Sequence, residues 1–168
     1  EDISGLANYE AVKRSDNNFT NHPAFKAVSD FSNQIKAPEK STGWFLPSIG
    51  QWLEIAKNLG KLNLSDQQNN EITAAWYWSY VELSGDAVSI STYLGDLGEY
   101  YAQKNINEYL IMLGNKADIF KVDDNSAYWS SSEHSATGAY YPQFFRDYFH
   151  IPNNQKIYDV YIRAILAF

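Results

Sequence analysis

The sequence predicts an α+β fold, with helices along the first two thirds of the chain and an antiparallel sheet in the last third. Before residue 114, apolar residues recur every three or four positions, which is the spacing of one helix face. After residue 128, short runs rich in Tyr, Trp, Phe and Val alternate with turn residues, as in a sheet. With 168 residues and no cysteine, the chain is long enough to bury one core without disulfides.

The start of the chain predicts an irregular lead followed by a helix. Residues 1–22 are rich in Asn, Ser and Asp, and we expect no regular element there. Pro23 suits the first turn of a helix, and Ala37-Pro38 ends it. One face of this helix carries four apolar side chains, Phe25, Val28, Phe31 and Ile35.

A short apolar run follows this helix. Trp44-Phe45-Leu46 predicts a strand, which Pro47 closes. Because strand side chains alternate between two faces, we expect Trp44 and Leu46 to point inward.

Three capping boxes predict three further helices. In each box, Ser or Asn is followed three residues later by Gln or Glu, which satisfies free amide groups at a helix start. The boxes begin at Ser48, Ser65 and Asn105, and a glycine follows each apolar stripe. Residues 76–81 also suit a strand. We expect a helical insertion around residues 63–105.

The region after residue 128 predicts the sheet. Residues 128–132 and 139–141 are typical of strands, and Arg146-Asp147 of a turn between two aromatic strands. We expect Trp129 to lie in the core, with the serines after it hydrogen-bonded locally at a bend.

The last nine residues predict a terminal strand. Its apolar face carries Val160, Ile162, Ala164, Leu166 and Phe168. Arg163 is the only charged residue in this strand. Since buried charges are normally paired, we expect an ion pair, for which Glu133 is a candidate partner.

Charge and composition exclude several classes of function. The net charge of −7 disfavours nucleic acid and anionic membrane surfaces as partners. The lack of cysteine excludes thiolate zinc sites, iron–sulfur clusters and cysteine nucleophiles. No apolar run approaches the ~18 residues of a spanning helix, so we expect no membrane insertion.

Five motifs occur in order along the chain. They are Pro23-Ala24-Phe25, Gly43-Trp44-Phe45-Leu46-Pro47-Ser48, Tyr128-Trp129-Ser130-Ser131-Ser132-Glu133, Ala139-Tyr140-Tyr141 and Tyr161-Ile162-Arg163-Ala164-Ile165-Leu166-Ala167-Phe168. This series resembles the bacterial domain family named after the C-terminal domain of the Legionella collagen-like protein, common in surface proteins of Bacteroides-type bacteria. The resemblance spans residues 23–59 and 106–168 and implies a C-type-lectin-like fold.

The resemblance also implies a function. Domains of this family are binding or adhesion modules, so we expect one non-enzymatic domain over residues 1–168, as the C-terminal part of a longer surface protein. The implied location is the cell surface, outer-membrane-associated, or secreted. The implied partner is a glycan or a host or partner protein, with neighbouring domains of the same protein as further partners. The segment 63–105 is longer than in the family.

The expected ligand-binding face lies within residues 134–161. Tyrosine rings give rigid contact area and stack on sugar faces, while amides form adaptable hydrogen bonds. The candidate ligand-binding residues are Tyr140, Tyr141, Phe145, Tyr148, His150, Asn153, Asn154 and Tyr158. The alternative is an ordinary Tyr-rich sheet, in which rings only pair across strands.

We expect no catalytic residues. The acidic residues form no recognisable pair for acid–base chemistry. Ser130 to Ser132 with Glu133 and His134 could suggest a triad, but sequence neighbours on a strand point to opposite faces. The resembled family is similar to the formylglycine-generating enzymes, whose chemistry relies on cysteines that this chain lacks.

We expect no metal or other cofactor. His22, His134 and His150 are too widely separated for a zinc motif. Asp123-Asp124-Asn125 offers oxygens outside any EF-hand pattern. Calcium-dependent lectins use a Glu-Pro-Asn or Gln-Pro-Asp loop, whereas this chain has Ile151-Pro152-Asn153.

Other functions remain open. A structural or assembly subunit of a pilus or cell envelope predicts a large apolar patch near residues 1–22 or 66–104 and no ligand groove. A retroelement-diversified variable receptor predicts that sibling sequences differ mainly within residues 133–158. A hydrolase would need two carboxylates in one cleft.

Overall fold

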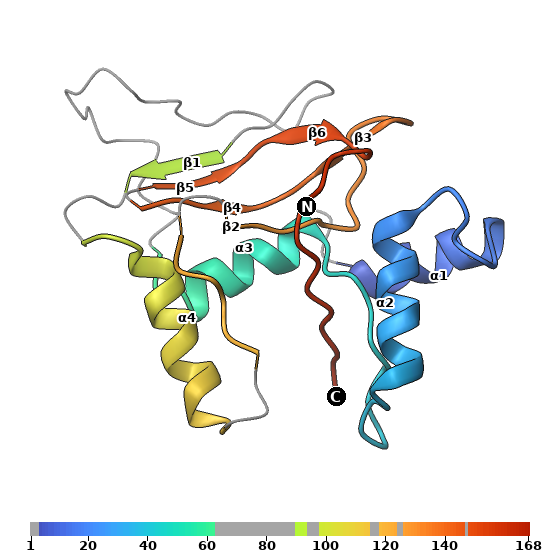
Figure 1. Cartoon of the computed structure of the whole chain (residues 1–168), viewed down its shortest axis with the longest axis horizontal. Coiled ribbons are helices and arrows are strands. Elements are labelled where there is room, and N and C mark those ends of the chain that lie inside the picture. The colour runs from blue at the N-terminus through green and yellow to red at the C-terminus, as the bar shows by residue number, and fades with distance from the viewer. Residues whose placement is uncertain (1–3, 63–89, 94–97, 115–117, 124–125, 147) are drawn as a thin grey trace. The chain divides into compact units, whose positions relative to one another are not determined.

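The computed structural model describes most of the chain (Figure 1). The described residues are 4–62, 90–93, 98–114, 118–123, 126–146 and 148–168. They form four helices and six short strands, and the strands lie in one four-stranded and one two-stranded sheet. The α+β class predicted from the sequence is confirmed.

The chain divides into two compact units, which we describe separately. The first comprises residues 1–52, 128–140 and 154–168, and the second comprises 53–127 and 141–153. Each unit therefore combines segments that are distant in sequence, so neither can be cut from the chain in one piece.

The first unit begins with a helix that the sequence analysis missed. It contains α1 (Gly5–Ser15), α2 (Pro23–Gln34), the beginning of α3 (Ile49–Asn58), β3 (Gly138–Tyr140) and most of β6 (Asn153–Gln155). The expectation that residues 1–22 are irregular is wrong, because α1 is stabilised by tertiary contacts that its polar sequence hides. The ring of Tyr9 lies 5.1 Å from that of Phe19 and 6.1 Å from that of Phe25, measured between centroids.

Two of the sequence motifs meet in this unit. The backbone N–H of Ser131 donates to Pro47 O (2.8 Å), and that of Ile49 donates to Ser132 Oγ (2.9 Å). The predicted capping box is present, because Gln51 N–H donates to Ser48 Oγ (3.3 Å) and Ser48 N–H to Gln51 Oε1 (3.0 Å). The serines thus anchor the start of α3.

Residues 128–132 form no extended strand, which corrects the sequence analysis. β2 (Ser126–Ala127) ends just before them, and Tyr128 makes a single parallel bridge with Tyr161. Ser130 Oγ accepts from the N–H of Ser132, so the serine hydroxyls turn the chain out of the sheet direction. Trp129 is buried, as expected.

The run around Phe45 also differs from expectation. Phe45 and Leu46 are both buried, whereas Trp44 is half-buried and donates its indole N–H to Ile35 O (2.9 Å). Phe45 forms an isolated antiparallel bridge with Ile165. Because the pairing is confined to this bridge, strand alternation does not govern which side chains are buried.

The C-terminal segment pairs at two isolated points rather than forming the predicted strand. Tyr161 bridges in parallel to Tyr128, and Ile165 bridges antiparallel to Phe45. These opposite directions prevent a continuous ladder. The predicted apolar face is consequently not buried as a unit, and Phe168 is 88% exposed.

The second unit contains the larger sheet. Its strands are β1 (Ile90–Tyr93), β2, β4 (Gln143–Phe144) and β5 (Tyr148–Ile151), antiparallel in the order β1-β5-β4-β2. The predicted antiparallel pairing of two aromatic strands is confirmed, because β4 and β5 pair with Phe144 opposite Phe149, while Asp147 of the predicted turn lies outside the described residues. These two buried rings lie 5.0 Å apart, and Phe120 packs 5.8 Å from Phe144.

Helix α4 (Tyr101–Met112) begins four residues before the predicted capping box. Gly98 (φ +92°) and Tyr100 (φ 57°) adopt left-handed conformations that turn the chain into the helix. Asn105 is therefore a buried position inside α4, and its side-chain amide donates to Gly60 O (3.2 Å).

The expected helical insertion at 63–105 is described only in part. Residues 63–89, including the predicted helix after Ser65, lie outside the described residues. Among the described residues of this segment, 90–93 form a strand and α4 begins at Tyr101. Within the described part of the chain, no helix combines the length and apolar character needed to cross a membrane.

Candidate functional site

The eight predicted ligand-binding residues divide between the two units. The first unit holds Tyr140, Asn154 and Tyr158. The second holds Tyr141, Phe145, Tyr148, His150 and Asn153. We therefore describe two partial faces, one in each unit.

In the first unit, the two-stranded sheet supports the predicted residues. Tyr140 lies on β3, and its hydroxyl is 3.2 Å from His134 Nδ1. Asn154 lies on the neighbouring strand β6. Tyr158 follows a turn closed by its own N–H donating to Gln155 O (3.2 Å), and is 53% exposed.

In the second unit, strand pairing places the other predicted residues. His150 is half-buried in the middle of the sheet, opposite Gln143 on β4 and Ser91 on β1. Tyr141 N–H donates to Pro152 O (3.1 Å), which brings Tyr141 beside Asn153 in the chain fold.

The remaining two residues of this group flank the β4–β5 turn. Phe145 is half-buried directly after β4, and Tyr148 starts β5 opposite Tyr93. Backbone pairing thus gathers these residues near one turn.

A small open pocket lies in the first unit, and none of the eight predicted ligand-binding residues lines it. Its volume is about 30 Å³. Its lining residues are His22, Pro23, Ala24, Phe25, Trp129, Ser130, Ser131, Glu133, Ala139 and Lys156. Since one water needs roughly 10–15 Å³, the pocket holds two or three atoms and cannot enclose a sugar ring.

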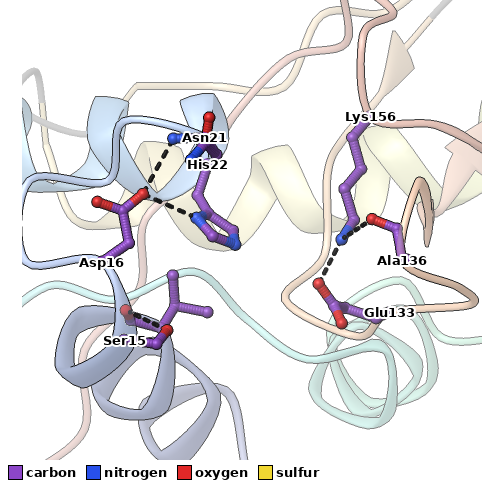
Figure 2. A network of polar contacts seen from close by, with 8 residues as sticks. Ser15, Asp16, Asn21, His22, Glu133, Ala136 and Lys156 are labelled. Atoms are coloured by element: carbon purple, nitrogen blue, oxygen red, sulfur yellow. Dashed lines mark hydrogen bonds and ion pairs between the residues drawn. The ribbon is translucent and has the colours of Figure 1, made fainter.

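One edge of the pocket carries His22, held by Asp16 (Figure 2). His22 Nδ1 is 3.2 Å from Asp16 Oδ2, which also accepts the backbone N–H of Asn21 (2.9 Å). Hydrogen bonds from the backbone of Asn21 and Thr20, with a smaller contribution from His22, lower the pKa of Asp16 to about 2. Asp16 is therefore ionised at neutral pH and orients the imidazole.

Another edge carries an ion pair between Glu133 and Lys156 (Figure 2). Lys156 Nζ also donates to Ala136 O (3.2 Å), and its side chain is 22% exposed against 52% for Glu133. The structure places Lys156 beside Glu133, where the sequence suggested Arg163. Lys156 was missed because it lies 23 residues from its partner and no motif links the two.

The serines of the suggested triad have structural hydrogen bonds. Ser130 Oγ donates to Tyr140 O (2.6 Å), and Ser131 Oγ accepts from Asn8 Nδ2 (3.1 Å). Ser132 Oγ accepts the N–H of Ile49, and His134 contacts the Tyr140 hydroxyl. These hydrogen bonds hold neighbouring segments of the fold together.

The histidines and carboxylates of the described residues do not gather into a group of three or more that could hold a metal ion. His22 contacts Asp16, and Glu133 contacts Lys156, so each is engaged in a pair.

Comparison with models of protein families, with curated proteins and with solved structures gave no match for this chain.

Proposed function

We propose that this chain is a non-enzymatic recognition or adhesion module of a bacterial cell-surface or secreted protein, binding a glycan or protein ligand. The exposed ring of Tyr158 (53% exposed) carries the proposal. Tyr161, three residues on, is 41% exposed, and Asn154 precedes the same turn. Exposed tyrosines next to amides suit non-covalent contact with sugars or proteins.

We extend the proposal to a C-type-lectin-like fold related to the Legionella collagen-like protein C-terminal domains. The hydrogen bonds between the Pro47–Ile49 segment and the serines of residues 130–132 support this extension. The two most specific motifs of the resemblance are thus hydrogen-bonded to each other, as expected if both belong to the core of one family fold.

The hydrogen bonding of the serines supports a non-enzymatic role. A nucleophilic hydroxyl needs a base within hydrogen-bond reach. Ser130 Oγ instead donates to a backbone carbonyl, and the pocket beside it holds only two or three atoms.

The second candidate is an assembly subunit, and one observation favours it. Ile111, Met112 and Leu113 at the end of α4 are 64%, 81% and 75% exposed. Ile119 and Val122, in the segment that follows, are 50% and 42% exposed. Contiguous exposed apolar side chains are typical of surfaces that bind another protein.

A binding screen of the whole chain against a glycan array and a panel of surface proteins tests the proposal. We expect saturable binding to at least one glycan or protein. Turnover of glycoside or ester substrates would contradict the non-enzymatic role. Binding that is confined to copies of the chain or to neighbouring domains, and is lost in a Met112→Glu variant, would favour the assembly subunit instead.

A further inference from the structure

The pocket of the first unit differs from the predicted tyrosine-rich face. Ala139 lines the pocket, and Tyr140 is the next residue on β3. Because successive strand residues point to opposite faces, the pocket and the Tyr140 side chain lie on opposite sides of this strand. The pocket is therefore a separate site.

The pocket is apolar inside and polar at its edge. Phe25, Trp129 and Ala139 are buried residues that line it, together with Ala24 at the start of α2. A methyl group and the carbon bonded to it are two water-sized atoms, which fit within a volume of about 30 Å³.

The edge offers both donors and acceptors of hydrogen bonds. Lys156 supplies an ammonium with three donors, two of which are used by Glu133 and Ala136 O. The half-exposed Glu133 carboxylate has lone pairs left to accept. His22 lines the same pocket, with Nδ1 turned to Asp16, so Nε2 is its group available for a ligand.

We propose that this pocket binds the acetamido group of an N-acetylated amino sugar. The methyl enters the apolar pocket, and the carbonyl oxygen accepts from the third donor of the Lys156 ammonium. The sugar ring stays outside, because the pocket is too small for it. Like the proposed function, this inference concerns a glycan ligand. It does not depend on the tyrosine-rich face.

The polar edge favours a sugar over an acetylated lysine. Both carry the same acetamido group. The hydroxyls of a sugar ring can pair with Glu133 and His22 at the pocket opening, whereas the four methylenes of a lysine side chain leave these groups without new partners.

Saturation-transfer NMR on the whole chain tests the inference with three probes, N-acetylglucosamine, glucose and N-acetyl-lysine amide. We expect the strongest saturation on the acetyl methyl of N-acetylglucosamine and weaker binding of the other two. Ala24→Leu fills the pocket from a helix position, and Lys156→Met removes the donor at similar length. Each substitution should weaken the binding of N-acetylglucosamine about tenfold, which corresponds to roughly 1.4 kcal/mol of binding free energy.

Circular dichroism checks that both variants fold. If Ala24→Leu does not fold, Lys156→Met alone still tests the inference. Equal binding of glucose, unchanged affinity in a folded pocket variant, or tighter binding of N-acetyl-lysine would overturn the inference. Tyr158→Ala separates this test from that of the proposed function, because it alters the exposed tyrosine and leaves the pocket intact. If the array shows ligands that lack acetamido groups, the inference fails while the recognition function stands.

Discussion

Gly5 occupies a position where the fold has no room for a side chain. A Cβ at this residue would lie 2.5 Å from both Gln51 Oε1 and Leu46 O. Gly5 also donates its backbone N–H to Gln51 Oε1 (3.1 Å), which ties α1 to the capping box of α3.

Gly5→Ala should therefore lower the free energy of unfolding by about 1–3 kcal/mol, as overpacking of a filled site does. Chemical denaturation measures the change. Ala7→Ser, at an exposed position of the same helix, is the matched control and should stay within about 0.5 kcal/mol. Equal stability of Gly5→Ala and the native chain would show that α1 does not pack against this segment.

Asp16 should make stability depend on pH in the acid range. Its pKa of about 2 in the folded chain lies below the ordinary unfolded value of roughly 3.9. The ionised Asp16 carboxylate therefore contributes its full stabilisation of the folded state above about pH 4, and this stabilisation is lost as the pH falls toward 2. Denaturation midpoints measured from pH 5 to pH 2 should fall less steeply in Asp16→Asn, which keeps an oxygen to accept from Asn21. An identical slope in both proteins would contradict the assigned role.

Replacing two buried amide side chains in α4 should change the stability in opposite directions. Gln103 is fully buried, and no residue in the described part of the chain bonds to either amide atom. Asn107 is also buried, but it donates to Phe120 O (2.9 Å) and accepts from Phe120 N–H (2.7 Å).

Gln103→Met should raise the free energy of unfolding by about 1 kcal/mol, because it removes unsatisfied polar atoms at nearly constant volume. Asn107→Leu should lower it by about 1–3 kcal/mol, since it removes two buried hydrogen bonds to the backbone of Phe120. Thermal unfolding of both variants measures these changes in stability. Destabilisation by Gln103→Met would mean that its amide has a partner in solution.

The start of α3 depends on a hydroxyl supplied from a distant segment. Ser132 Oγ accepts the N–H of Ile49, 83 residues away in the sequence. Ser132→Ala should cost about 1 kcal/mol of stability, as the loss of other helix-start hydrogen bonds does. Ser15→Ala removes an exposed hydroxyl that donates to Val12 O and serves as the control, with a change below about 0.5 kcal/mol. Similar effects of the two changes would contradict the anchoring role.

Local signals in the sequence were sufficient for some elements only. Pro23 and the Ser48–Gln51 box act on their own helix ends, so α2 and α3 were predictable. The polar sequence of α1 concealed a ring contact with Phe25, and the turn at Tyr100 moved the start of α4 away from Asn105. These differences come from contacts that no local pattern encodes.

The fold class was predictable because it depends on which periodicity dominates each part of the chain. The pocket was not predictable, because Pro23, Trp129 and Lys156 come from three separate segments of the first unit. The pairing of Glu133 with Lys156 depends on the path of the chain between β3 and β6, which the sequence alone does not specify.

Recognition through exposed tyrosines is the central claim, and one comparison of affinities tests it most directly. The measurement is the dissociation constant of the best ligand from the binding screen, for the native chain, Tyr158→Ala and Tyr109→Ala. Tyr109 is the matched control, since it is 40% exposed but lies on α4, outside the predicted residues. We predict about tenfold weaker binding for Tyr158→Ala and no change for Tyr109→Ala. Equal affinities of Tyr158→Ala and the native chain would contradict the claim.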